Sequence, residues 1–228
     1  MTPPTVVVTG ASRGIGAAVA RALAPDHRLV LLGRDRGALE AVAADCPDAV
    51  VVPLDLTDHA AVEACPELRA LGRVDGLVHS AGVATAGRID EVPPSAWREA
   101  FEVNVLAVVV LTRTLLAALR AAGGHVVAVN SGAGHQARPA RGSYSASKFA
   151  LRAFTDTLRQ EEPGLRVTSV HPGRVDTDMQ RALVAAESGE YRAAEYLRPE
   201  SVAAAVRHAL LAGDDAHPTE VVLRPRGG

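Results

Sequence analysis

The sequence predicts an α/β fold: a Rossmann-type, doubly wound parallel sheet of about seven strands with helices on both faces. Short runs of β-branched and aliphatic residues alternate with segments of helical periodicity along the whole chain. A glycine-rich turn also joins the first apolar run to the first helical segment, as in nucleotide-binding sheets. The 228 residues contain no internal repeat and no long linker, so we expect a single domain over 1–228.

The apolar runs are expected to form the strands. The first run, Thr5–Thr9 (TVVVT), is short and β-branched, which suits a strand that is buried on both faces. Because helical segments separate the runs, we expect the strands to lie parallel with right-handed crossovers. In chain order, the predicted strands cover residues 5–9, 28–32, 49–54, 76–79, 125–129, 166–171 and 220–223.

The segments between these runs show helical spacing. In the first of them, Ile15, Val19 and Leu23 recur at intervals that place them on one helix face. The predicted helices cover residues 14–24, 37–44, 58–71, about 95–122, 144–161 and 199–212. Residues 174–198 are polar and contain no strand, and we expect them to form a mobile flap over a pocket after the sixth strand.

Composition argues against several classes of protein. The 24 Lys and Arg nearly balance the 26 Asp and Glu, which argues against a nucleic-acid or basic membrane-binding protein. Aromatic residues make up only 3%, too few for stacking along a single strand. There is no long uncharged apolar run and no basic leader, so we expect no membrane partner and a cytoplasmic location. Cys46 and Cys65 stand alone, so we expect neither a disulfide framework nor a metal site.

The segment Thr9–Gly16 (TGASRGIG) follows the first predicted strand and opens the first predicted helix. A tight turn without side chains lets the backbone approach a pyrophosphate, and the helix N-terminus presents free N–H groups to it. A glycine triplet also occurs in ordinary strand-to-helix turns, but its position after a buried strand favours dinucleotide binding.

The spacing GxxxGxG resembles that of the short-chain dehydrogenase/reductases, in their single-domain branch with TGxxxGxG and YxxxK motifs. Further pieces occur in the family's order between residues 9 and 177. They are Asp55-Leu56, His79-Ser80-Ala81-Gly82, Asn104, Ser131, Tyr144 with Lys148, and Pro172-Gly173 with Thr177. The resemblance implies that the cofactor contacts Gly10, Ser12, Arg13, Gly14, Ile15, Gly16, Arg34, Asp55, Leu56, Ala81, Gly82, Tyr144, Lys148, Pro172, Gly173, Val175 and Thr177.

The end of the second predicted strand indicates which dinucleotide binds. Enzymes that use NAD usually place a carboxylate there for the ribose 2′-OH, but this chain has Gly33 followed by Arg34. A guanidinium can clamp a 2′-phosphate, and Arg13 points toward the same region in the family. We therefore expect NADP(H), with NAD(H) the less favoured cofactor. The alternative is that Arg34 is a solvated surface charge and Asp35 binds the ribose.

Two family positions that flank the cofactor leave alternatives open. Asp55 resembles the residue that accepts a hydrogen bond from the adenine, but it is also suited to cap a helix or to close a turn. The usual Asn-Asn-Ala-Gly appears here as His79-Ser80-Ala81-Gly82. The backbone role of Ala81 and Gly82 can survive this change, and we interpret His79 as a packed or cofactor-facing residue, not a catalytic one.

Tyr144 and Lys148 are the central candidates for catalysis. A spacing of four places them on one face of a helix. A free phenol has a pKa near 10, so acting as a base requires positive charge nearby, which an ammonium and an oxidised nicotinamide would provide. When a carbonyl is reduced, the same phenol donates its proton.

Ser131 and Asn104 complete the predicted set. Ser131 lies just past the end of the fifth predicted strand, where ligand crevices form in parallel sheets, and its hydroxyl can stabilise a developing alkoxide. Asn104 lies within a helical segment, where asparagine is disfavoured. In the family this residue marks a kink whose carbonyl holds a water that links the lysine to solvent. The alternative is a helix-face residue bonded to its own backbone.

The expected function is therefore an NADP(H)-dependent oxidoreductase that interconverts a small-molecule carbonyl and an alcohol by hydride transfer, with Tyr144 as acid and base. The alternative is a dinucleotide-sensing binding protein of the same fold without chemistry. The segments 105–119 and 149–158 carry more apolar surface than one sheet face can cover. We therefore expect a homodimer or homotetramer, as in the family.

Overall fold

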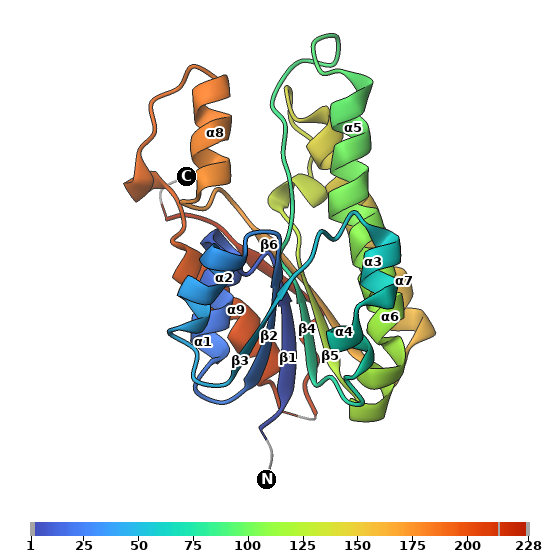
Figure 1. The fold of residues 1–228 in the computed structure, drawn as a ribbon. Coiled ribbons are helices and arrows are strands. Elements are labelled where there is room, and N and C mark those ends of the chain that lie inside the picture. The colour runs from blue at the N-terminus through green and yellow to red at the C-terminus, as the bar shows by residue number, and fades with distance from the viewer. Residues whose placement is uncertain (1–2, 214, 227–228) are drawn as a thin grey trace.

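The computed structural model describes residues 3–213 and 215–226. Its centre is a sheet in the order β3-β2-β1-β4-β5-β6-β7, in which every neighbouring pair is parallel (Figure 1). The doubly wound Rossmann fold is confirmed. The strands are β1 (Thr5–Thr9), β2 (Arg28–Gly33), β3 (Ala49–Pro53), β4 (Gly76–His79), β5 (His125–Val129), β6 (Arg166–Pro172) and β7 (Glu220–Leu223).

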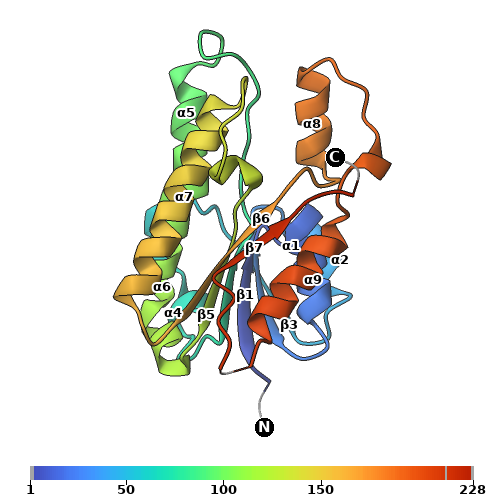
Figure 2. The same ribbon diagram turned by 180° about the vertical axis from the view of Figure 1, so that it is seen from behind.

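Helices cover both faces of this sheet (Figures 1 and 2). One face carries α1 (Gly14–Leu23), α2 (Arg36–Ala43) and α9 (Pro199–Leu210). The other carries α3 (His59–Ala64), α4 (Pro66–Arg69), α6 (Ala107–Ala122) and α7 (Gly142–Glu161). Two large apolar clusters result, one under each helical layer, and the sheet separates them. A small third cluster joins Val108, Ala128 and Leu151.

The alternation of side chains along β1 explains why a continuous apolar run was needed. Val6 and Val8 belong to the cluster under α1 and α9, whereas Val7 belongs to the cluster under α6. All three side chains are fully buried. Successive residues of a strand point to opposite faces, so a sheet covered on both sides requires apolar residues at every position.

The predicted helix over 58–71 is wrong in one respect, because it is broken into α3 and α4. Pro66 occupies the first position of α4, and Cys65 before it has an extended ψ of 116°. A proline ring disfavours the helical conformation of the preceding residue, so the chain cannot continue the first helix through this point.

The longest helical segment runs from Pro94 to Ala122 and contains α5 (Pro94–Phe101), a π-helical turn over Glu102–Leu106, and α6. Its length and hydropathy alone would allow it to cross a membrane. In this fold, however, Leu111, Leu115 and Leu119 of α6 are buried in the core against the sheet. The α6 part of the segment therefore packs as a core helix, whereas most side chains of α5 are exposed.

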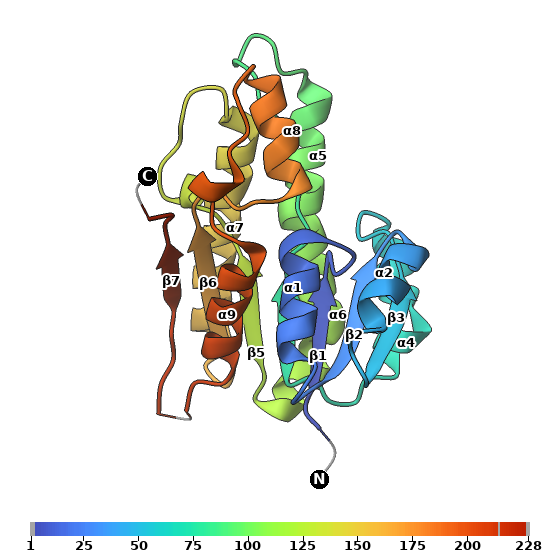
Figure 3. The ribbon, with the colours of Figure 1, turned by 90° about the vertical axis from the view of Figure 1, so that its left-hand side faces the viewer.

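The predicted flap over 174–198 contains no strand, as expected, but it does contain helix. It is built from α8 (Asp178–Ala186) and a short 3₁₀ turn, Ala193–Glu195. The segment lies beyond the end of β6, to one side of the upper part of α5 (Figures 2 and 3). Thr177 caps α8 by accepting a hydrogen bond from the Gln180 amide at 3.3 Å. The role of this segment as a mobile flap stays a prediction.

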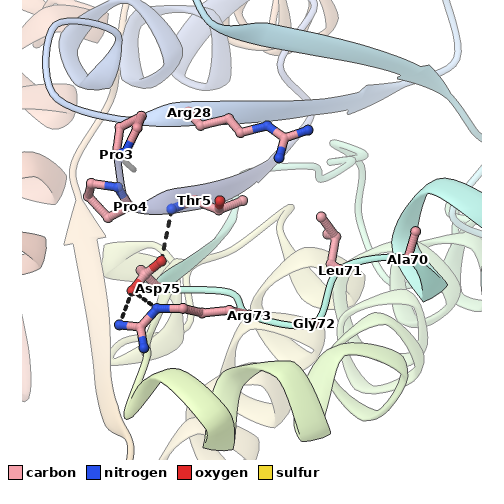
Figure 4. A pocket seen from close by; sticks show the side chains of 9 residues that line it. All are labelled: Pro3, Pro4, Thr5, Arg28, Ala70, Leu71, Gly72, Arg73 and Asp75. Atoms are coloured by element: carbon pink, nitrogen blue, oxygen red, sulfur yellow. Dashed lines mark hydrogen bonds and ion pairs between the residues drawn. The ribbon is translucent and has the colours of Figure 1, made fainter. Parts of the chain in front are cut away.

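A shallow pocket lies at the amino ends of the strands, away from the glycine-rich turn (Figure 4). Asp75 dominates it: its carboxylate accepts hydrogen bonds from the Thr5 amide at 2.9 Å and from the Arg73 guanidinium. These bonds fix the start of β1 beside the start of β4. The residues that line the pocket are Pro3, Pro4, Thr5, Arg28, Ala70, Leu71, Gly72, Arg73 and Asp75. We interpret it as structural, because reactive groups gather at the opposite end.

Candidate active site

The carboxyl ends of β1 and β4 are held together by one hydroxyl. Thr9 Oγ1 accepts hydrogen bonds from the backbone amides of Ser80 at 3.0 Å and Ala81 at 3.1 Å. Gly10 follows at once, and a Cβ on it would lie 2.9 Å from the Ala81 backbone. The glycine-rich turn and the Ala81-Gly82 segment therefore pack directly against each other. A side chain at position 10 would clash with the Ala81 backbone.

The turn itself is shaped for close approach by a ligand. Gly10 and Gly14 have positive φ values of 62° and 55°, a backbone region that favours glycine. A Cβ on Gly16 would lie 2.1 Å from the Gly10 carbonyl oxygen, so a side chain is excluded there. The first turn of α1 contains no acidic residue, which leaves its N–H groups available to an anion. These features fit a dinucleotide pyrophosphate, with Ser12 and Ile15 partly exposed beside it.

The end of β2 bears on the choice between NAD(H) and NADP(H). Asp35 caps α2, because its carboxylate accepts a hydrogen bond from the Ala38 amide at 3.0 Å. Arg34 is exposed and lies near Asp55, whose pKa it helps to lower. Arg13 lies 3.9 Å from Asp178 of α8 and is highly exposed. The Asp35 carboxylate thus serves as the cap of α2, whereas the Arg34 side chain is exposed to solvent.

Asp55 adopts the turn geometry that the sequence left open as an alternative. Its carboxylate accepts hydrogen bonds from the amide and the hydroxyl of Thr57 at 2.9 and 2.8 Å, and these bonds lower its pKa. The cap of α3 is Asp58, which accepts from the Ala61 amide. Leu56 next to Asp55 packs against the core under α6. An adenine contact by Asp55 stays a prediction.

His79 is a packed residue. Its Nε2 lies 2.9 Å from Thr112 Oγ1, and burial lowers its pKa to about 3. The ring is therefore neutral at physiological pH and supplies no acid or base. The hydroxyl of Ser80, the second departure from the usual family segment, is buried without a hydrogen-bond partner in the described part of the chain.

Asn104 lies in the π-helical turn and is completely buried. Its side chain accepts a hydrogen bond from the Val83 amide and donates to the Val83 carbonyl, both at 2.9 Å. It also donates to the Ser147 hydroxyl at 2.9 Å. A Cβ on Gly82 would lie 3.1 Å from Asn104 Oδ1 and 3.9 Å from Lys148 Nζ. Asn104 therefore clamps the segment after β4 onto α7, and it is not a free helix-face residue.

Tyr144 and Lys148 lie one turn apart near the start of α7. The Lys148 nitrogen is 5.8 Å from the centroid of the Tyr144 ring, and it donates a hydrogen bond to the Val129 carbonyl at 2.9 Å. The side chain of Ser131, two residues after Val129, lies near enough to Tyr144 to lower the pKa of its phenol. The three groups predicted for catalysis are thus brought together at the carboxyl end of β5.

Burial controls the electrostatics of this group. It raises the pKa of Tyr144, while hydrogen bonding by Ser131 and the charge of Arg141 act against that rise. Burial also lowers the pKa of Lys148 to about 8. The phenol therefore keeps its proton at neutral pH, and the ammonium bonds to a backbone carbonyl instead of the phenol oxygen.

The segment after β6 lies between β7 and the glycine-rich turn. The Gly173 amide donates to the Leu223 carbonyl at 2.8 Å, which fixes Pro172-Gly173 beside β7. Val175 is buried and forms an isolated bridge with Leu197. Thr177 reaches back to the glycine-rich turn: a Cβ on Gly14 would lie 3.4 Å from its methyl group. This places Thr177 beside the predicted pyrophosphate position.

Two residues near the site were not predicted as parts of it. Ser147 is a hydrogen-bond partner of Asn104, and His171 Nδ1 lies 3.0 Å from the Ser131 carbonyl oxygen. A serine inside a helix and a histidine inside a buried strand carry no spacing signal, so only the folded arrangement shows their contacts.

Comparison with known proteins agrees with this geometry. A family model described as short chain dehydrogenase matches residues 4–188. The glycine betaine reductase ATRR of Emericella nidulans is 38% identical over 96% of this chain, which spans only 18% of that protein. Dehydrogenase/reductase SDR family member 7B of Bos taurus is 35% identical over 82% of this chain, and the match covers 62% of that protein.

A solved structure extends the likeness to three dimensions. It is the alcohol dehydrogenase of the archaeon Thermococcus sibiricus, complexed with 5-hydroxy-NADP. It has a TM-score of 0.91 and 32% identity, and the match covers 99% of this chain and 97% of that one. The family model, the relatives, the strand order and the glycine-rich turn all agree. The chain belongs to the short-chain dehydrogenase family of oxidoreductases.

Proposed function

We propose that this protein is an NADP(H)-dependent oxidoreductase that interconverts a small-molecule ketone or aldehyde and the corresponding alcohol. The observation that carries the proposal is the grouping of Tyr144, Ser131 and Lys148 at the end of β5, with Asn104 clamping the adjacent segment onto α7. The glycine-rich turn follows β1, two strands from β5, at the same edge of the sheet. Reactive groups and a dinucleotide cradle thus share one edge.

The shape of the cradle supports the cofactor assignment. Gly10 and Gly16 exclude side chains from the turn, and the start of α1 carries no acid that would repel a diphosphate. Arg34 is exposed at the end of β2, whereas Asp35 is occupied as a helix cap. The similar archaeal enzyme is described in complex with an NADP derivative. When bound, the nicotinamide supplies or accepts the hydride.

The chain's own residues handle the proton and the substrate oxygen. Burial keeps Tyr144 protonated, so its phenol can donate to a carbonyl oxygen that is gaining charge. The Ser131 hydroxyl donates a second hydrogen bond to that oxygen, and this bond strengthens as the alkoxide develops. Lys148 adds positive charge beside the phenol, and Asn104 holds the segment that carries Gly82 near the Lys148 nitrogen.

Exposed apolar side chains support the proposal of a homodimer or homotetramer. Leu106 and Phe149 are 45% and 43% exposed, and they lie on adjoining helical elements. Apolar side chains of this size are commonly covered in an assembly. We also propose a cytoplasmic location, which rests on the sequence features described above.

The test of the function is a Tyr144→Phe variant, assayed with NADPH and with NADH against a panel of ketones and aldehydes. We expect kcat/KM to fall by about 10²–10⁴-fold, because a proton donor to the transition state is lost. Binding of NADPH, measured by nucleotide fluorescence, should change little. Tyr196→Phe is the matched control, since the Tyr196 ring packs against Tyr191 in the 174–198 segment. Full activity of the Tyr144 variant would refute the mechanism. NADPH binding without turnover by the unaltered protein would favour the sensing role.

A further inference from the structure

A cluster of three potential metal ligands lies at the β6–β7 edge of the sheet, which is visible in Figure 3. His135 follows the 3₁₀ turn Gly132–Gly134 after β5, His171 belongs to β6, and Glu220 begins β7. One ligand atom from each residue lies within 4.8 Å of the other two. The three residues are far apart in the sequence, so no local spacing of His or Cys residues could reveal the cluster.

His171 has an unpartnered nitrogen that is aimed into this cluster. The ring is completely buried, and its Nδ1 lies 3.0 Å from the Ser131 carbonyl oxygen. A carbonyl oxygen can only accept, so Nδ1 carries the hydrogen. In the neutral ring, the lone pair is then on Nε2, which has no hydrogen-bond partner in the described part of the chain. Nε2 lies 3.8 Å from a Glu220 oxygen.

His135 presents a second nitrogen in the same direction. Its Nε2 is also buried without a hydrogen-bond partner among the described residues, and it lies 4.0 Å from the other Glu220 oxygen. The two imidazole rings are 3.9 Å apart between centroids. Distances of 3.8 and 4.0 Å are too long for hydrogen bonds, so contacts within the cluster leave both nitrogens unsatisfied.

We propose that His135 Nε2, His171 Nε2 and the Glu220 carboxylate bind a divalent transition-metal ion of the zinc type. Two imidazoles and one carboxylate are the ligand types of three-ligand zinc sites, and they suit zinc better than magnesium or calcium. Ligand atoms around a tetrahedral zinc are about 3.3 Å apart, so small side-chain rotations close the site. The bond from His171 Nδ1 to a backbone carbonyl is the usual device that orients a metal-binding histidine.

The cluster is partly open to solvent, and the Arg152 guanidinium competes with a metal ion for the Glu220 carboxylate. The side chains of His135 and Glu220 are 25% and 32% exposed, which gives an ion in solution access and leaves a position for water. Arg152 Nε donates to Glu220 Oε1 at 3.1 Å, and Arg152 also lies 3.9 Å from Asp156. Its positive charge opposes a cation at Glu220. Removal of the guanidinium should therefore tighten metal binding.

The inference goes beyond the proposed reaction and does not depend on it. The cluster contacts the Ser131 backbone only through His171 Nδ1, and binding of Zn²⁺ alone reports it. A bound ion would polarise the Nδ1–H group of His171 and strengthen its bond to the Ser131 carbonyl. The metal is thus connected to the loop after β5 through one imidazole ring.

The experiment uses tag-free protein stripped with EDTA and titrated with Zn²⁺ by calorimetry, and with Co²⁺ by visible absorption. We expect one ion per chain and the intense absorption of four-coordinate Co²⁺, without the thiolate charge-transfer band that binding at a cysteine would give. Glu220→Gln and His135→Gln should each weaken Zn²⁺ binding by about tenfold or more, and Arg152→Gln should tighten it. His208→Gln, on the exposed face of α9, is the matched control.

Both ligand variants alter partly exposed side chains, so circular dichroism should show that they remain folded; the buried His171 is left unchanged. Absence of a one-to-one site in the unaltered protein would overturn the proposal. It would also be overturned if the folded Glu220→Gln and His135→Gln variants bound Zn²⁺ with unchanged affinity. Activity assays take no part in this test, so its outcome is separate from that of the proposed function.

Discussion

The Lys148 nitrogen lies 2.9 Å from the carbonyl oxygen of Val129, the last residue of β5. This bond attaches the active face of α7 to the strand end that carries Ser131 two residues later. It also holds a positive charge in a buried position, 5.8 Å from the Tyr144 ring. The bond therefore positions the lysine, and the burial of its nitrogen lowers its pKa.

The first prediction concerns the effect of that charge on stability. Burial lowers the pKa of Lys148 from 10.5 to about 8, so the folded protein releases this proton before the unfolded chain does. The free energy of unfolding should therefore rise between about pH 8 and pH 10.5, relative to Lys148→Met, by about 3 kcal/mol in total. Below pH 8 both states hold the proton, and the difference should be constant. Urea unfolding of both proteins at several pH values measures this, and a flat difference across the range would contradict it.

The second prediction concerns Ser131. Ser131→Ala removes a hydrogen bond that lowers the pKa of Tyr144 and one that is expected to stabilise the alkoxide. We expect kcat to fall by about 10²–10³-fold with NADPH affinity nearly unchanged. The Tyr144 pKa should rise further, which phenol absorption during an alkaline titration detects. Ser95→Ala, exposed at the start of α5, serves as the control, and equal losses in the two variants would be evidence against a specific role.

Arg34 gives the third prediction. Arg34→Gln removes the exposed guanidinium at the end of β2, while Asp35 keeps its bond to the helix. A charge-assisted bond contributes about 1.5–3 kcal/mol, so KM for NADPH should rise by roughly 10- to 100-fold. KM for NADH should be nearly unchanged. Arg36→Gln is the control, because Arg36 pairs with Glu40 on the outside of α2. Parallel losses for both nucleotides would show that Arg34 does not recognise the 2′-phosphate.

The fourth prediction concerns the clamp made by Asn104. Asn104→Ala leaves the Val83 amide and carbonyl and the Ser147 hydroxyl without their buried partner. We expect the free energy of unfolding to fall by about 2–4 kcal/mol, since unsatisfied buried groups retain their full desolvation cost. Asn104→Asp keeps the acceptor for the Val83 amide but loses both donated bonds. Equilibrium unfolding in urea compares the variants, and a loss under about 0.5 kcal/mol in the alanine variant would mean that the clamp contributes little.

The fifth prediction tests assembly. Phe149→Glu places a charge at an exposed apolar position of α7. If this surface is an interface, the unaltered protein should scatter light as a dimer or tetramer, and the variant should shift toward the monomer mass. A monomer mass for the unaltered protein would refute the proposal.

The sequence was sufficient for the sheet and for the outline of the site. Strands such as β1 are apolar at every position because both faces are covered, and this pattern needs no tertiary information. The spacing of Tyr144 and Lys148, and the place of Ser131 at a strand end, follow from helix and sheet geometry. The prediction of one helix over 58–71 followed the helical periodicity across Cys65 and gave too little weight to Pro66, whose ring breaks the helix there.

Contacts between segments that are distant in the sequence could not be predicted from local sequence patterns. The bonds of Asn104 to Val83 and Ser147 depend on how the π-helical turn meets α7, and the grouping of His135, His171 and Glu220 depends on strand order. Hydrogen-bond partners are fixed by packing in three dimensions, and a single sequence carries no local pattern for them.

The π-helical turn has a consequence for how this scaffold can vary. The Ala107 amide bonds to the Glu102 carbonyl, five residues back, so one residue more than an α-helix needs is accommodated at this point. Deleting a single residue within 102–106 would restore uniform α-helical winding and leave α5 and α6 facing as they do now, because the wide turn holds the extra residue without rotating the flanking helices. The effect would be local: Asn104 would lose the widened turn that presents it to the Val83 backbone, while Trp97 would keep its place against Gly142 of α7. The turn thus acts as a joint that lets the outer helix keep its own orientation while the inner helix stays in register with the sheet.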